Sequence, residues 1–199
     1  MDDIEIRDFK VDIPTKEVDR LHHKLQDTRL PAREIVPNIK QTPNTESGNE
    51  GPRYEWAQEM LAKWTTEFDW MDVQKQLNQY PHYLAMLEQV QIHFLHARAE
   101  APDATSLLLV HGWPGSFYEF SRVWDPLSHP ADAANGQAFH VVVPSMSGFC
   151  WSDWPPRACW ILRDTAQLFD KLMRKLGYSK YMVQCGDWGH FVGRELGAR

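Results

Sequence analysis

The chain has 199 residues and a formal net charge of −6 at pH 7, and hydrophobic residues make up 43% of it. This length fits one domain, or one domain with an extension, and the apolar content is enough for a packed core. The acidic balance, with Lys and Arg scattered along the chain, excludes the basic surface of a nucleic-acid-binding protein. No apolar run approaches the roughly 18 residues of a membrane span.

Cysteine usage and the N-terminal residues give an expectation about the compartment. Residues 1–5 are acidic and lack the apolar region of a secretory signal. The three cysteines, Cys150, Cys159 and Cys185, show no disulfide-framework spacing. We therefore expect reduced thiols and a cytoplasmic protein with no membrane association evident in this chain.

The N-terminal part is predicted to be mainly helical. We expect an extended arm over residues 1–14 and helices over 15–27, 54–68 and 70–77. The second helix carries an aromatic and apolar stripe, which we expect to pack in a core: Trp56, Met60, Trp64 and Phe68. Four prolines and two glycines exclude regular structure over residues 31–53, an unusually long irregular segment.

Two strands with a tight turn follow, over residues 83–87 and 90–97, and they predict a hairpin. His93 and His96 lie three residues apart in the second strand. Since alternate residues of a strand point to opposite faces, this spacing directs the two rings away from each other. We therefore expect ordinary hydrogen-bonded histidines and no metal site.

From residue 105 onward, strands alternate with helices. The apolar runs 107–110, 139–143 and 181–185 predict buried strands. A helix is expected from Ser116 as its cap to about Leu127, and another is expected to open at Asp164 and to close at Gly177. This order predicts an α/β fold with a mostly parallel sheet flanked by helices, whose functional sites lie at the carboxyl ends of the strands.

One such end is a candidate nucleophile turn. In Cys185-Gly186-Asp187-Trp188-Gly189 a strand runs into a helix through small residues, with Asp187 at the apex. Small flanking residues let strand and helix approach closely in a strand–turn–helix elbow. An ionised carboxylate there suits attack on a saturated carbon, which gives an ester intermediate. On its own the five-residue pattern also fits a plain loop.

A second strand end supplies the matching backbone donors. Hydrolysis of an aspartyl ester passes through an oxyanion, which hydrogen-bond donors must stabilise. The loop His111-Gly112-Trp113-Pro114-Gly115 follows a four-residue apolar strand, and its Trp113 keeps a free N–H. We expect the N–H groups of Trp113 and Trp188 to form an oxyanion hole, supported by His111, Gly112 and Pro114.

Motifs along nearly the whole chain carry a resemblance to a known family. They are residues 111–116, Pro144-Ser145 with Gly148, Leu172-Met173 with Leu176-Gly177-Tyr178, and 186–189, and in the N-terminal part Leu77-Asn78, residues 80–83 and 92–96. With these motifs the chain resembles the microsomal-type epoxide hydrolases of the α/β-hydrolase superfamily. That group also contains insect juvenile hormone epoxide hydrolases and soluble fungal enzymes.

The resemblance implies a partial α/β-hydrolase fold preceded by an N-terminal helical and meandering extension. Residues 1–100 would form the epoxide-hydrolase-type N-terminal region, including the meander 31–53, and residues 101–199 the first half of the hydrolase core. Asp187 would open a small hydrophobic epoxide to a vicinal diol through an ester, without a cofactor or metal. The family's activity serves detoxification and aromatic hydrocarbon catabolism. The residues Phe149, Trp151 and Trp154 would line the substrate pocket.

The chain also departs from the family pattern. Cys185, Ser147 and Cys150 stand where the family more often has Gly, Pro and Gly. We expect the family's lid tyrosines, orienting acid and water-activating histidine to lie downstream. His190 is the only histidine after Asp187 in this sequence, and at the start of a helix we do not expect it to activate water at its own elbow.

Three readings of the function therefore stay open. The chain is an incomplete N-terminal portion of an epoxide hydrolase, an inactive fragment or pseudoenzyme that at most binds hydrophobic ligands, or another Asp-nucleophile hydrolase such as a haloalkane dehalogenase. In each case we expect self-association through an uncovered sheet edge.

Overall fold

The computed structural model describes residues 5–32, 53–101, 103–132 and 136–198, and the chain divides into two compact units. Residues 12–76 form one unit, and residues 1–11 together with 77–199 form the other. Apart from its ends, the segment 31–53 that we predicted to be irregular lies outside the described residues.

The smaller unit is helical. It holds α1 (Thr15–Gln26), α2 (Tyr54–Thr66) and most of α3 (Trp70–Leu77), each within two residues of its predicted bounds. The prediction that the α2 stripe packs in a core is wrong, because Trp56 and Trp64 are 53% and 49% exposed. The helix α2 packs on α1, and the Trp64 ring meets Phe68 edge-on, with ring centroids 6.4 Å apart.

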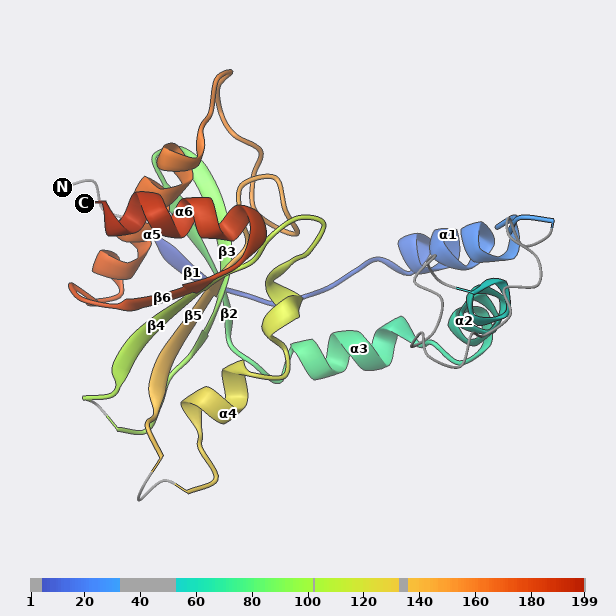
Figure 1. The fold of residues 1–199 in the computed structure, drawn as a ribbon, viewed down its shortest axis with the longest axis horizontal. Coiled ribbons are helices and arrows are strands. Elements are labelled where there is room, and N and C mark those ends of the chain that lie inside the picture. The colour runs from blue at the N-terminus through green and yellow to red at the C-terminus, as the bar shows by residue number, and fades with distance from the viewer. Residues whose placement is uncertain (1–4, 33–52, 102, 133–135, 199) are drawn as a thin grey trace, which may run out of the picture. The chain divides into compact units, whose positions relative to one another are not determined.

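The larger unit is built on a six-stranded sheet (Figure 1). The strand order is β1-β2-β3-β5-β4-β6. The strands are β1 (Ile6–Phe9), β2 (His82–Leu87), β3 (Val90–Ala97), β4 (Thr105–Val110), β5 (Phe139–Pro144) and β6 (Met182–Cys185). The predicted α/β class is confirmed.

The sheet is mixed, so the prediction that it is mostly parallel is wrong. Strand β4 is parallel to β5 and β6, but β1, β2, β3 and β5 are joined by antiparallel pairings. The predicted hairpin explains part of the antiparallel half. Its two-residue turn, Glu88 and Gln89, has positive φ at both positions, as hairpin turns that match the twist of the strands require.

Two helices cover one face of the sheet, namely α5 (Leu162–Lys175), which contacts β2, and α6 (Asp187–Gly197), which contacts β4 and β6 (Figure 1). The apolar side of α5 is fully buried. The helix ends as predicted at Gly177, whose φ of +93° is a glycine conformation. Its start differs, because Ile161 occupies the N-cap position and Asp164 lies in the first turn, where its Oδ2 accepts the Ile161 N–H at 2.8 Å.

The single helix predicted over 116–127 is also wrong. The segment forms a 3₁₀ turn, η1 (Phe117–Phe120), and a separate short helix, α4 (Trp124–Ser128). Pro126 accounts for the break, because it has no N–H for the carbonyl of Arg122 and its ring would collide with that carbonyl in a continuous helix. Ser116 does act as a cap, since its Oγ accepts the N–H of Tyr118 at 3.2 Å.

Candidate active site

Asp187 lies at the turn between β6 and α6, in a conformation that few side chains adopt. Its φ of 51° falls in the left-handed region, and it is the first residue of α6. Gly189 lets the helix approach β4, since a Cβ there would lie 2.6 Å from the His111 carbonyl oxygen. The strand–turn–helix predicted from the small residues around Asp187 is therefore present, with the strain typical of a functional turn.

Two backbone N–H groups point at the Asp187 carboxylate. The N–H of Trp113 donates to Oδ1 at 2.8 Å, and the N–H of Trp188 is the second donor. These two bonds lower the pKa of Asp187 from its ordinary value. The side chain is exposed and ionised at neutral pH, so it is available as a nucleophile.

A histidine joins the loops that follow β4 and β5. The Met146 N–H donates to His111 Nε2 at 3.1 Å, while His111 Nδ1 lies 3.0 Å from the carbonyl oxygen of Gly112. The N–H of Gly115 reaches the same oxygen at 3.2 Å, across a cis peptide between Trp113 and Pro114. The strand ends that we expected to meet at one edge of the sheet do meet there.

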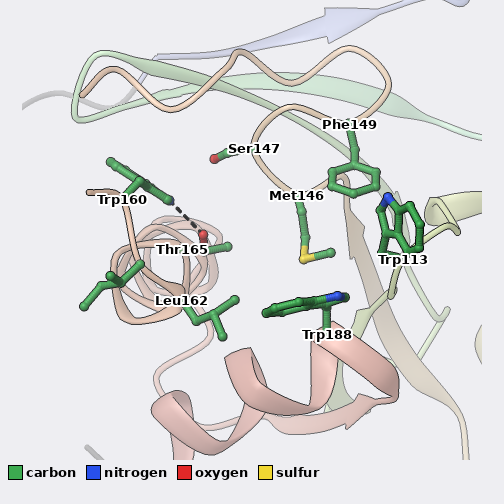
Figure 2. Close-up of a pocket in the computed structure, with 9 residues that line it drawn as sticks. Trp113, Met146, Ser147, Phe149, Trp160, Leu162, Thr165 and Trp188 are labelled. Carbon is green, nitrogen blue, oxygen red and sulfur yellow. Dashed lines mark hydrogen bonds between the residues drawn. The ribbon is translucent and has the colours of Figure 1, made fainter. Parts of the chain in front are cut away.

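A largely apolar cavity of about 740 Å³ opens next to this turn (Figure 2). Trp113 and Trp188 line it, so both residues that donate to Asp187 also border the cavity. The other lining residues are Met146, Ser147, Phe149, Trp160, Ile161, Leu162 and Thr165.

Of the three aromatic residues that we expected at the pocket, Phe149 lines the cavity and the other two lie elsewhere. Trp151 packs on His93 and Phe9, with ring centroids 4.8 and 5.3 Å away. Trp154 is 79% exposed and covers Gly148 from outside. Trp151 belongs to the packing behind the loop, and Trp154 belongs to its outer surface.

The wall opposite Trp113 and Trp188 was missed by the sequence analysis (Figure 2). It comes from the start of α5, where the Trp160 indole N–H donates to Thr165 Oγ1 at 2.9 Å. Arg157 lies over the Trp160 ring at 5.4 Å from its centroid. The available signal was the apolar run 160–162, which precedes the buried face of α5 and is not part of it.

The buried histidines of the sheet have structural partners. His93 bonds to His82 Nδ1 at 3.0 Å and to Ser145 Oγ at 2.9 Å, whereas His96 bonds to the Tyr178 hydroxyl at 2.9 Å. His190 is exposed on α6, with its ring against Phe191. Among the described residues, no cluster of His, Cys, Asp and Glu could hold a metal ion.

None of the helices that the structure describes is long and apolar enough to cross a membrane.

Comparison with known proteins extends over both units. Residues 6–120 match the family model "Epoxide hydrolase N terminus", and residues 105–199 match "alpha/beta hydrolase fold". Epoxide hydrolase 1 of Oryctolagus cuniculus is 34% identical over 202 residues, which cover 96% of this chain and 42% of the rabbit protein.

Solved structures agree with these matches. The Aspergillus niger epoxide hydrolase has a TM-score of 0.81 and 34% identity, covering 97% of this chain and 49% of the fungal one. The juvenile hormone epoxide hydrolase of Bombyx mori has a TM-score of 0.82 and 29% identity, covering 98% of this chain and 50% of the silkworm one. The chain thus spans half the length of these relatives or less, and it belongs to the microsomal-type epoxide hydrolase family.

Proposed function

We propose that this chain supplies the nucleophile and the oxyanion hole of an epoxide hydrolase. The observation that carries the proposal is the Asp187 carboxylate, which receives the N–H groups of Trp113 and Trp188 beside an apolar cavity. The cavity fits a hydrophobic epoxide, because its lining offers few polar groups that could bind a polar one.

In the first step, Asp187 Oδ2, the carboxylate oxygen that does not accept the Trp113 N–H, attacks an epoxide carbon. The bond from that carbon to the ring oxygen breaks, and the ring oxygen takes up a proton from solvent water, which leaves hydroxide in solution. The product is a hydroxyalkyl ester of Asp187. Trp113 keeps its hydrogen bond to Oδ1, which becomes the carbonyl oxygen of the ester.

In the second step, water adds to the ester carbonyl carbon, and negative charge develops on Oδ1. The N–H groups of Trp113 and Trp188 already point at this carboxylate, so little rearrangement is needed to stabilise the charge. Collapse of the intermediate releases the diol and leaves the oxygen of the water molecule in the Asp187 carboxylate.

This second step needs a base. His111 is the histidine nearest to Asp187 in the site and His190 the nearest in the sequence, and neither is placed to act as that base. His111 is buried with both ring nitrogens engaged, and His190 is exposed on α6. We therefore expect the ester to form on the described residues and to persist, because water attack is not assisted.

The test is intact-mass spectrometry of the purified chain after incubation with styrene oxide. We expect a mass increase equal to one epoxide, located on Asp187 by peptide mapping, with no diol release. Asp187→Asn is the matched control and should stay unmodified. Equal labelling of this variant, or no labelling of the unmodified chain, would contradict the nucleophile assignment. Steady diol formation would contradict the expectation that no described residue acts as the base for water attack.

A further inference from the structure

We propose that His111 is a positioning residue that fixes the oxyanion hole, and that it does so only as the neutral Nδ1–H tautomer. The name oxyanion hole, and the role in ester chemistry that it implies, rest on the proposed function. The effect of His111 on the Asp187 carboxylate does not, because that effect follows from the hydrogen bonds alone.

The tautomer follows from the partners of the ring. A backbone N–H is always a donor, so the Met146 N–H at 3.1 Å requires Nε2 to be an acceptor without a proton. A carbonyl oxygen is always an acceptor, so the Gly112 oxygen at 3.0 Å requires Nδ1 to carry the proton. Both bonds are satisfied by one neutral form of the ring.

The Gly112 carbonyl and the Trp113 N–H belong to the same peptide group. Because that group is planar and trans, its C=O and N–H point in opposite directions and turn together. His111 Nδ1–H holds the oxygen at one end at 3.0 Å, with the Gly115 N–H as a second donor at 3.2 Å. The N–H at the other end therefore points at Asp187 Oδ1, 2.8 Å away.

Protonation would break this arrangement. A proton on Nε2 would face the Met146 N–H, and the ring would have to move away from the loop after β5. The Phe149 ring, with its centroid 4.9 Å from that of His111, limits such movement. Glu119 is the charged side chain whose field favours protonation, and the Gly112 carbonyl also favours it, but burial outweighs both and lowers the pKa of His111.

The experiment measures the carboxyl pKa of Asp187 by carbon-13 NMR in three variants. His111→Asn keeps a side-chain N–H near the position of Nδ1 and loses the acceptor for Met146. His111→Gln keeps an acceptor near the position of Nε2 and loses the donor to Gly112. His96→Gln is the matched control, a buried histidine of the same sheet whose partner is Tyr178.

We expect His111→Gln to raise the Asp187 pKa by about one unit, with His111→Asn and His96→Gln leaving it nearly unchanged. An unchanged Asp187 pKa in His111→Gln, or the same rise in His96→Gln, would overturn the proposal.

Nitrogen-15 NMR of the unmodified chain gives a second measurement that needs no variant. We expect Nδ1 to show the chemical shift of a protonated nitrogen and Nε2 that of an acceptor at pH 7. The opposite pattern overturns the proposal even if the variants unfold. If the pKa responses occur but styrene oxide never labels Asp187, the proposed function fails and the role of His111 stands.

Discussion

Gly112 lies so close to Asp187 that a Cβ atom on Gly112 would be 2.6 Å from the Asp187 Cβ and 2.7 Å from Oδ1. The backbone φ of Gly112 is not in the left-handed region, so other residues could adopt its conformation. The close contact with Asp187 is therefore the reason that a glycine is needed here. Asp187 cannot yield easily, because its backbone is fixed between β6 and α6.

Gly112→Ala should therefore displace the carboxylate from the Trp113 N–H. We expect the rate of labelling by an epoxide to fall by about 100-fold, as misplacement of a reacting group by about 1 Å does. Intact-mass measurement over time gives the rate. Gly197→Ala is the control, because nothing lies within 4 Å of a Cβ there. Equal labelling rates in the two variants would contradict the contact argument.

Acid should destabilise the larger unit through its buried histidines. Burial lowers the pKa of His93 to about 3 and that of His96 to about 4, and it lowers the pKa of His82 as well. The unfolded chain binds these protons near pH 6.5. Between pH 6.5 and about 4 the unfolded state thus holds more protons, and the free energy of unfolding falls as pH falls.

The expected slope is about 1.4 kcal/mol per pH unit for each histidine, and it disappears below the folded-state pKa. Urea unfolding at pH 7, 6, 5 and 4 measures it. His93→Gln should reduce the slope, whereas His190→Gln, at an exposed position, should not. A free energy of unfolding independent of pH over this range would show that these rings are protonated in the folded chain.

Trp160 should control which epoxides fit. It forms the wall of the cavity opposite Trp113 and Trp188, and Thr165 holds its indole in place. Trp160→Ala enlarges the cavity, so we expect labelling by stilbene oxide to rise by about 10-fold relative to styrene oxide. Trp154→Ala removes an aromatic ring of the same kind from outside the cavity and should leave the ratio unchanged. If Trp154→Ala changed the ratio of stilbene oxide to styrene oxide labelling and Trp160→Ala did not, the substrate would bind outside this cavity.

The parts of the fold that depend on short stretches of chain could be predicted from the sequence. Local apolar periodicity located α5, and the small residues around Asp187 located the elbow. The antiparallel pairing of β3 with β5 joins Phe94 to Pro144 across fifty residues, and no local pattern specifies such a partner. Pro126, which causes the break before α4, was visible in the sequence, and the capping signal at Ser116 was given too much weight.

The candidate site divides in the same way. Asp187, Trp113 and Trp188 lie at strand ends, where parallel topology predicts that they meet. Trp160 and Thr165 border the cavity because α5 packs against α6, which is a tertiary contact between helices. The sequence could not show which of Phe149, Trp151 and Trp154 line the cavity and which lie on the outer surface. They belong to an irregular loop, whose side chains follow no repeating pattern that would assign them to a face.

Self-association is expected at β6. Within the described residues this strand pairs only with β4, and it ends the strand order of the sheet. Met182 on this strand is 56% exposed. An unpaired strand edge with apolar side chains is a template for pairing with another chain.

Met182→Lys should therefore shift the chain toward monomer, because a charged side chain on an edge strand opposes pairing. Light scattering coupled to size-exclusion chromatography, at several protein concentrations, measures the mass. Met71→Lys, at a methionine that is 51% exposed in the helical unit, is the control and should leave the mass unchanged. A monomeric mass for the unmodified chain at all concentrations would refute the expectation, and an equal effect of both substitutions would assign self-association to general apolar exposure.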